Sequence, residues 1–122
     1  MVENFPDLNT GTTTEIWAGY DDRPDHMGGI LRGLVKFDIS GLPADATITS
    51  ATLRMAHVTS WGLENESLTM TTHRVTGDWS ELGVTWNNQP GYAGNYGSQA
   101  ILWGDWNWFD FDMSSLVMDW HE

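Results

Sequence analysis

A period of two in the apolar residues marks the middle of the chain. Two sets of apolar side chains occupy every second position of their segments: Val35, Phe37 and Ile39 in the first, and Ala51, Leu53 and Met55 in the second. Alternate side chains of a strand point to the same face of a sheet, so both segments are predicted to be core strands. Gly41 and Pro43 favour a turn between them.

Four more segments are rich in β-branched and aromatic residues and are bounded by turn-forming ones. They predict strands at residues 13–19, 68–75, 84–87 and 106–111. A short helix is expected at residues 114–120, with Asp112 or Ser114 as its cap and Leu116, Val117 and Trp120 on one face. Together these elements predict an all-β, jelly-roll-like sandwich of short antiparallel strands with one short helix near the C-terminus.

Composition narrows the classes of partner. The 122 residues suit a single domain with a core of its own, and the chain has no cysteine. Seventeen Asp and Glu against five Lys and Arg give a net charge of -12, which argues against a nucleic-acid partner. No stretch approaches the roughly 20 apolar residues of a membrane helix, so no membrane insertion is expected.

Two longer segments carry a resemblance to a known family. Residues 33–54 and 74–90, the second with Trp79 and Trp86, resemble the DNRLRE or disaggregatase-related repeat, which overlaps a carbohydrate-binding module family. The resemblance implies a non-catalytic domain located outside the cell or at its surface. Compared with that family, the chain lacks the first and last strands, so residues 1–122 are expected to be one sandwich domain or a fragment of a longer one. Open sheet edges would permit self-assembly by strand addition.

The motif at residues 74–90 also has a purely structural interpretation, which is the favoured one. Trp79 and Trp86 are large enough to close the end of a sandwich, and Asn87 and Asn88 can bond to neighbouring backbone groups. Asp78 and Glu81 lie in one turn, where capping explains them better than catalysis across a cleft. With no nucleophile or phosphate-loop motif either, the chain is predicted not to be an enzyme.

The eight tryptophans exceed what one core of this size needs. On a strand, Trp106 and Trp108 point to one face and Phe109 and Phe111 to the other, so both faces are aromatic. If the phenylalanines fill the core, the tryptophans form an exposed platform. The predicted ligand-binding residues, which include two tyrosines of a Gly-rich loop, are Trp103, Trp106, Trp108, Asn107, Tyr92 and Tyr96. Flat aromatic surfaces suit both sugar rings and protein partners, and both alternatives stay open.

A calcium site is the one cofactor hypothesis. Asp21, Asp22 and Asp25 cluster in one loop, and Ca²⁺ binds six to eight oxygen ligands from such loops. The spacing does not match an EF-hand, and a solvated acidic loop is the simpler interpretation. The scattered histidines do not have the spacing of a zinc site.

Two functions follow from the sequence. The first is a carbohydrate-binding module that recognises a polysaccharide, more suitably a neutral than an acidic one, through an aromatic face, with calcium as a candidate assistant. The second is a structural or adhesive domain of a microbial cell-surface protein or filament, which binds neighbouring surface protein through exposed sheet edges. A third function, that of a polysaccharide-degrading enzyme, rests only on the association of the resembled family with such enzymes, and it is to be discarded if the chain releases no reducing ends.

Overall fold

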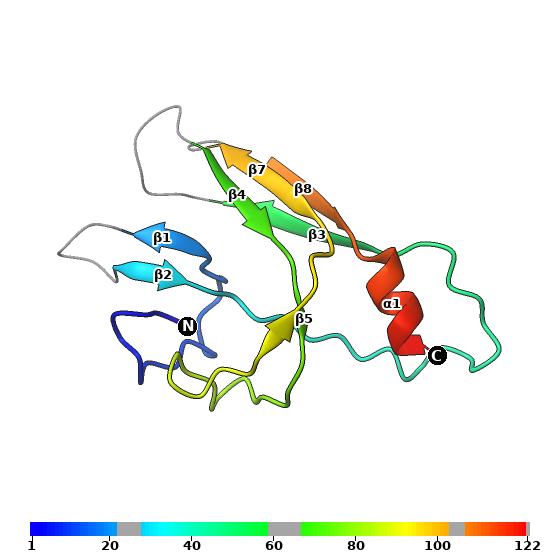
Figure 1. The fold of residues 1–122 in the computed structure, drawn as a ribbon, viewed down its shortest axis with the longest axis horizontal. Helices are drawn as coiled ribbons and strands as arrows, with labels where there is room; N and C mark the ends of the chain where they lie inside the picture. Colours follow the sequence, from blue (N-terminus) through cyan, green and yellow to red (C-terminus); the bar gives the residue numbers. More distant parts are fainter. Residues whose placement is uncertain (22–27, 59–66, 103–106, 122) are drawn as a thin grey trace. The chain divides into compact units, whose positions relative to one another are not determined.

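A computed structural model describes residues 1–21, 28–58, 67–102 and 107–121 of the chain. The chain divides into two compact units, each built from segments that are distant in the sequence. The first unit comprises Met1–Val35 and Val75–Ala93, and the second comprises Lys36–Arg74 and Gly94–Glu122. The described strands form two-stranded sheets, and Figure 1 shows one helix near the C-terminus.

The first unit contains a short antiparallel pair to which the N-terminal residues add. β1 (Gly19–Asp21) pairs with β2 (Gly29–Leu31) (Figure 1). On the other side of β2, Val2 forms a bridge with Leu31. Met1, Val2 and Leu31 are all buried, so this small apolar cluster is the core of the first unit among its described residues.

Asn9 connects the start of the chain to the motif at residues 74–90. Its amide nitrogen donates hydrogen bonds to the carbonyl oxygens of Glu81 (2.9 Å) and Val84 (2.7 Å). Gly11 lies so close to this turn that a Cβ there would be 2.2 Å from the Glu81 carbonyl oxygen. A side chain at Gly11 would therefore separate the two segments.

Of the tandem asparagines, Asn88 bonds to neighbouring backbone groups, as the sequence predicts, whereas the Asn87 amide bonds to another side chain. Asn88 accepts a hydrogen bond from the Thr85 nitrogen and donates one to the Gly83 carbonyl. Asn87 donates from its side chain to the Asp7 carboxylate at 2.8 Å. The prediction of a strand at 84–87 is wrong, because the Asn88 bonds close this segment into a turn instead of leaving its backbone groups for a neighbouring strand.

The second unit holds the longest strands. β3 (Thr52–His57) pairs antiparallel with β8 (Asn107–Asp112), and β4 (Ser67–Thr71) pairs antiparallel with β7 (Ser98–Leu102). β7 lies beside β8 (Figure 1). Strands were predicted at most of β3, β4 and β8, but β7 was not, because its Ser-Gln-Ala sequence has little β-propensity.

Side chains of β8 alternate between the two faces of the sheet. Phe111 is only 5% exposed and Phe109 is half-buried, whereas Trp108 and Asp110 are exposed. In β3, Leu53 is opposite Phe111 and is half-buried as well. The prediction that the phenylalanines face the interior and Trp108 faces outward is thus confirmed.

Helix α1 (Ser114–His121) follows β8 directly and begins where the sequence predicts. The Asp112 carboxylate accepts hydrogen bonds from the Ser114 nitrogen (3.0 Å) and hydroxyl (2.6 Å), and these bonds lower the pKa of Asp112. Leu116 is buried, but Trp120 is 41% exposed, so Trp120 does not share the buried face expected for it.

The alternating segment at residues 34–39 is the main disagreement with the sequence prediction. It is not a strand, and Val35 (37%) and Phe37 (57%) are exposed. Alternation shows that one face could be buried, but a strand also needs a backbone partner, and the structure pairs no strand with this segment. The strand expected at residues 13–19 is also displaced, since β1 begins only at Gly19.

Two very short strands complete the described elements. β5 (Arg74–Val75) pairs with β6 (Tyr92–Ala93), which lies in the segment predicted to be a Gly-rich loop. The all-β class with a single short C-terminal helix is confirmed, whereas the jelly-roll arrangement and the single domain over 1–122 stay predictions. Within the described residues, no helix is both long and apolar enough to cross a bilayer.

Candidate functional site

The solvent-exposed side of the β3–β8 pair is the candidate site, and we call it the outer face. Its side chains come from alternate positions of both strands: Thr52, Arg54 and Ala56 of β3, and Trp108, Asp110 and Asp112 of β8. The antiparallel register places Ala56 opposite Trp108, and Arg54 opposite Asp110. Residues more than fifty positions apart in the sequence thus become direct neighbours on one surface.

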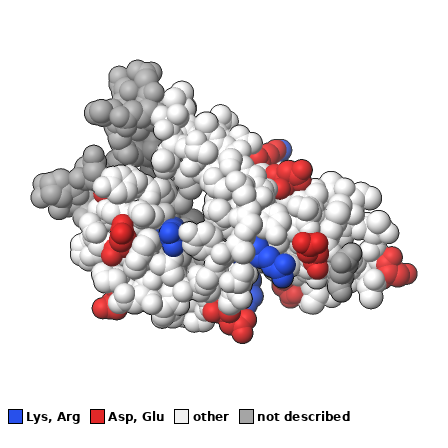
Figure 2. All heavy atoms as spheres, viewed as in Figure 1, with Lys and Arg blue, Asp and Glu red and all other residues white. Residues whose placement is uncertain are grey.

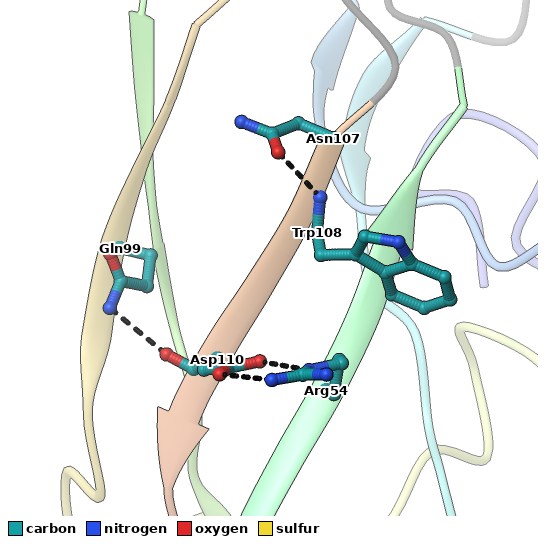
Figure 3. Close-up of polar contacts among 5 residues, drawn as sticks. All are labelled: Arg54, Gln99, Asn107, Trp108 and Asp110. Carbon is teal, nitrogen blue, oxygen red and sulfur yellow. Dashed lines mark hydrogen bonds and ion pairs between the residues drawn. The ribbon is translucent and has the colours of Figure 1, made fainter.

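Trp108 provides an aromatic surface on the outer face. Its side chain is 51% exposed, and the residue opposite it, Ala56, has only a methyl group with which to cover it. The Trp108 backbone nitrogen donates to the side-chain oxygen of Asn107 at 2.8 Å (Figure 3). Two of the predicted ligand-binding residues, Asn107 and Trp108, therefore lie together at the start of β8.

Arg54 and Asp110 form an ion pair next to Trp108. The Arg54 Nε and a terminal nitrogen donate to the two carboxylate oxygens at 2.8 and 3.1 Å (Figure 3). These hydrogen bonds lower the pKa of Asp110 and raise that of Arg54. Asp110 therefore remains a charged acceptor, and Arg54 a charged donor, at neutral pH.

Gln99 of β7 fixes the position of this pair on the sheet. Its side-chain nitrogen donates to the Asp110 backbone carbonyl at 2.9 Å (Figure 3). The side chains of the ion pair remain accessible, at 64% for Arg54 and 47% for Asp110. The outer face thus exposes an indole surface, a cation and an anion to solvent. The backbone that carries them is held by the hydrogen bonds between β3 and β8.

A different group of aromatic residues lies in the first unit, around Arg32. Its guanidinium carbon is 4.8 Å from the centre of the Trp86 ring and 5.0 Å from that of Tyr92. A terminal nitrogen of Arg32 donates to the Gln89 side-chain oxygen at 2.9 Å. Tyr92 was predicted to bind ligand, and in the structure its ring already stacks on this cation.

The comparison with protein families decides the class of protein. The profile of carbohydrate-binding module family 96 matches residues 1–122. The chain belongs to carbohydrate-binding module family 96. No curated protein and no solved structure matches it significantly. Modules of this kind bind carbohydrate without catalysing a reaction, so membership confirms the prediction that the chain is not an enzyme.

In this family 96 module, Tyr96 lies in the second unit beside its own turn. A Cβ at Gly94, whose φ is +71°, would be 2.7 Å from the Tyr96 ring, so the ring packs over that glycine. The Tyr96 nitrogen also donates to the Thr72 carbonyl at 3.0 Å. The ring is half-buried, which leaves part of it for a ligand.

The other predicted site residues are only partly described. Trp103, Trp106, Asp22 and Asp25 lie outside the described residues, and Asp21 is the last residue of β1. Within the part of the chain that the structure describes, no group of three or more His, Asp or Glu side chains could hold a metal ion. The calcium site therefore stays a prediction.

The sequence did not reveal Arg54 as a site residue. Arg54 precedes Asp110 by 56 positions, and only the β3–β8 register makes them partners. A charged residue at an exposed strand position gives no signal of its own. A prediction of which strands pair would have been needed to find it.

The surface of the module is acidic overall. On the face drawn in Figure 2, acidic side chains are scattered among uncharged ones and few basic side chains are present. This fits the net charge of -12. The field of the whole chain therefore disfavours polyanionic partners near the outer face.

Proposed function

We propose that the chain is an extracellular carbohydrate-binding module that recognises a polysaccharide through the outer face, with Trp108 as the stacking surface. The single observation that supports this most is the half-exposed indole of Trp108 beside the Arg54–Asp110 pair. An indole face packs against the C–H face of a sugar ring, and charged neighbours form hydrogen bonds with its hydroxyls. Membership of family 96 supplies the class of ligand.

The position of these groups on strands supports the proposal further. The β3–β8 ladder is continuous from Thr52–Asp112 to His57–Asn107, so backbone pairing fixes the groups before any ligand arrives. Preorganised groups lose little conformational entropy on binding. An exposed Trp on a loop would have to be ordered first.

Three further features belong to the proposal. The extracellular location and the relationship to the DNRLRE repeat rest on the sequence resemblance. Trp106 would extend the stacking surface, as its two-residue spacing from Trp108 suggests, and Trp103 is a further candidate ligand-binding residue. Calcium at Asp21, Asp22 and Asp25 would assist binding, and chelation tests it.

A structural or adhesive role is the second candidate, and open strand edges favour it. In the described structure, β3 pairs only with β8, and β4 only with β7. The outer edges of β3 and β4 therefore present backbone groups to which a strand of another chain could add. This role predicts concentration-dependent assembly, whereas the carbohydrate-binding role predicts saturable binding to a glycan.

Isothermal titration calorimetry against a panel of neutral and acidic polysaccharides tests the first role. The decisive variant is Trp108→Ala, and Trp120→Ala is its matched control because Trp120 is exposed in α1 of the same unit. We expect the affinity to fall about 30-fold in the first variant, which corresponds to the ~2 kcal/mol of an aromatic binding hot spot, and to be unchanged in the second.

The same titrations, repeated with calcium and with chelator, and on Trp103→Ala and Trp106→Ala variants, test the remaining parts. Absence of binding across the panel, or equal binding by the Trp108→Ala variant, would exclude the outer face as a sugar site. Light scattering over a range of concentrations then decides the second candidate, which a monomer at every concentration would exclude.

A further inference from the structure

Residues 34–39 have the side-chain pattern of a strand, but the structure pairs them with no strand. In Figure 1 the chain runs from β2 to β3 through this segment without a strand arrow. Among the described residues, no backbone nitrogen of the segment donates a hydrogen bond, and only the Ile39 carbonyl accepts one, from the Leu42 nitrogen at 3.0 Å. The other backbone groups of the segment are therefore available to an added strand.

The apolar side chains of this segment are exposed. Phe37 is 57% exposed and Val35 is 37% exposed, while Ile39, at the next alternate position, is half-buried. The two charged residues between them, Lys36 and Asp38, are exposed as well. A strand-like segment with an exposed apolar side and unpaired backbone groups is a surface to which another strand can add.

The segment of the same chain that is nearest in register does not supply this strand. In the β1–β2 pair, Gly19 lies opposite Leu31, and continuing that register would bring Thr13 opposite Phe37. Thr13 instead closes a turn, because its nitrogen and its hydroxyl donate to the Thr10 carbonyl at 3.1 and 2.8 Å. Its backbone is thus held in another conformation.

The order of the side chains fits a second copy of the same segment. When two copies pair antiparallel about Phe37, Val35 of each copy lies opposite Ile39 of the other, and Lys36 lies opposite Asp38. Every apolar residue then meets an apolar one, and both charged contacts join opposite charges, which stabilises cross-strand pairs. The segment is therefore complementary to itself about a two-fold axis, as the interface of a symmetric dimer must be.

The other symmetric pairings of this segment lack that match. A parallel pair in register places Lys36 opposite Lys36 and Asp38 opposite Asp38, and an antiparallel pair centred on either residue brings the same like charges together. An antiparallel pair centred between two residues places an apolar side chain opposite a charged one, such as Val35 opposite Asp38. The sequence thus favours a single symmetric register.

We propose that residues 34–39 are a dimerisation strand, which pairs antiparallel about Phe37 with the same segment of a second copy of this chain. One Asp38 oxygen accepts from the Ser40 nitrogen at 2.9 Å, and the other oxygen can accept from Lys36 of the second copy. The bonds to Ser40 also lower the pKa of Asp38, so the carboxylate is charged at neutral pH.

The dimer is expected to be weak. Six residues from each copy form less than the roughly 800 Å² per partner of a standard interface, so association should occur at micromolar concentrations. The net charge of -12 on each copy opposes association, but physiological salt screens charges more than about 8 Å apart and spares the close contacts between Lys36 and Asp38. A dimer would carry two outer faces and could hold a polysaccharide at two points. That consequence rests on the proposed function, whereas the dimer does not.

Sedimentation velocity on the full chain, at about 5 to 500 µM and in physiological salt, tests the proposal. We expect a monomer–dimer equilibrium without larger species. Lys36→Glu and Asp38→Lys each place like charges opposite one another twice in the dimer, so each should weaken it about tenfold or more. Asp45→Lys is the matched control, because it makes the same charge change as Asp38→Lys at an exposed position outside the segment. It should dimerise at least as well as the parent chain.

A mixture of the two charge variants tests the register itself. The Lys36→Glu copy has two acidic residues at these positions and the Asp38→Lys copy has two basic ones, so a heterodimer again joins opposite charges at both contacts. In an equimolar mixture we expect dimers to form with an affinity within about threefold of the parent value, although neither variant dimerises well alone. Misfolding would not produce such a recovery, and circular dichroism of each variant checks the fold.

Three results would overturn the dimer: a parent chain that is monomeric at every concentration, charge variants that dimerise as tightly as the parent, or a mixture that shows no recovery. A larger assembly that Lys36→Glu leaves unchanged would also overturn it, and would favour strand addition at the edges of β3 and β4 instead. No glycan enters these measurements, so failure of the dimer leaves the proposed function untouched. Conversely, glycan titrations that exclude the outer face as the sugar site leave the dimer untouched.

Discussion

Each unit of the molecule combines an arginine with aromatic side chains, but the surroundings of the two guanidinium groups differ. In the first unit, the Arg32 guanidinium lies over the rings of Trp86 and Tyr92 and is bonded to Gln89. In the second unit, Arg54 is paired with a carboxylate, and the indole of Trp108 lies beside the pair. The first cation is half-buried and has two rings of the protein against it, although Tyr92 is itself 51% exposed, whereas the side chains of the second pair are open to solvent.

The contacts that each ring already makes determine how much of it is available for binding. A ring that stacks on an internal cation already uses one face, and removing it would expose the partner. The half-exposed ring of Trp108, opposite an alanine, has surface left on which a ligand can pack. Stability should therefore depend on the Arg32 group, and glycan affinity on the outer face, and the two measurements can be made on the same variants.

The largest effect should come from Trp86→Ala. Its ring is partly buried against Arg32, so truncation removes packing and the cation–π contact together. We expect the free energy of unfolding to fall by about 2–3 kcal/mol, below the range for a fully buried Trp. Urea unfolding followed by circular dichroism measures it, with Trp120→Ala as the control. A stable Trp86→Ala variant that no longer binds glycan would reverse the comparison.

A smaller loss of stability is expected from Arg32→Met. The substitution keeps an unbranched apolar side chain between the two rings but removes the charge and the bond to Gln89. We expect a decrease of about 1–2 kcal/mol in the free energy of unfolding, with glycan affinity unchanged. A weaker affinity at parent stability would show that Arg32 and Tyr92 belong to a binding site, as the sequence predicted for Tyr92.

Arg54→Met should weaken glycan binding and leave the stability unchanged, which is the opposite of the effect expected for Arg32→Met. The side chain is exposed, and its strand position is retained, so the urea midpoint should match that of the parent chain. The affinity for a neutral glycan should fall about tenfold, which corresponds to ~1.4 kcal/mol, because the donors to a hydroxyl are lost. A shifted urea midpoint with unchanged affinity would make Arg54 a structural residue like Arg32.

The sequence predicted individual strands and the helix better than it predicted which strands pair. The strand predicted at residues 106–111 and the cap predicted at Asp112 or Ser114 each depend on neighbouring residues, and the structure confirms the strand over residues 107–111 and Asp112 as the cap. The segment at residues 34–39 has the same alternation as β3, but its strand prediction fails. The two segments have the same local pattern, and they differ only in that β3 pairs with a distant strand. That pairing could not be predicted from the sequence alone.

The candidate site shows the same division. Trp108 and Asn107 could be selected because composition and alternation put an excess tryptophan on an outward position. Arg54 could not, because its role depends on the register that places it opposite Asp110. The role of Tyr92 beside Arg32 likewise depends on a contact across 60 positions. The type of a residue suggests which ligand it could bind. Its long-range contacts determine whether the side chain packs against the protein or remains accessible to a ligand.

The smallest expected effect is that of mild acid on glycan binding, and it tests the state of Asp110. Hydrogen bonds from Arg54 lower its pKa, so the carboxylate persists to below the ordinary value of about 3.9. A carboxyl group whose pKa is lowered in the folded state contributes its full stabilisation at pH values above its unfolded pKa. That stabilisation is lost as the pH falls through the pKa of the folded state. Affinity should therefore be constant from pH 7 to about pH 5 and decline only below pH ~4.

The decline must be separated from unfolding, because Asp112 and Asp38 also have lowered pKa values and titrate in the same acidic range. Circular dichroism at each pH identifies the range in which the chain stays folded. The Asp110→Asn variant has no carboxylate to protonate at this position, so its weaker affinity should stay flat over the folded range. An affinity that falls already between pH 7 and 5 would place the titrating group elsewhere, and the outer face would no longer account for the charge dependence of binding.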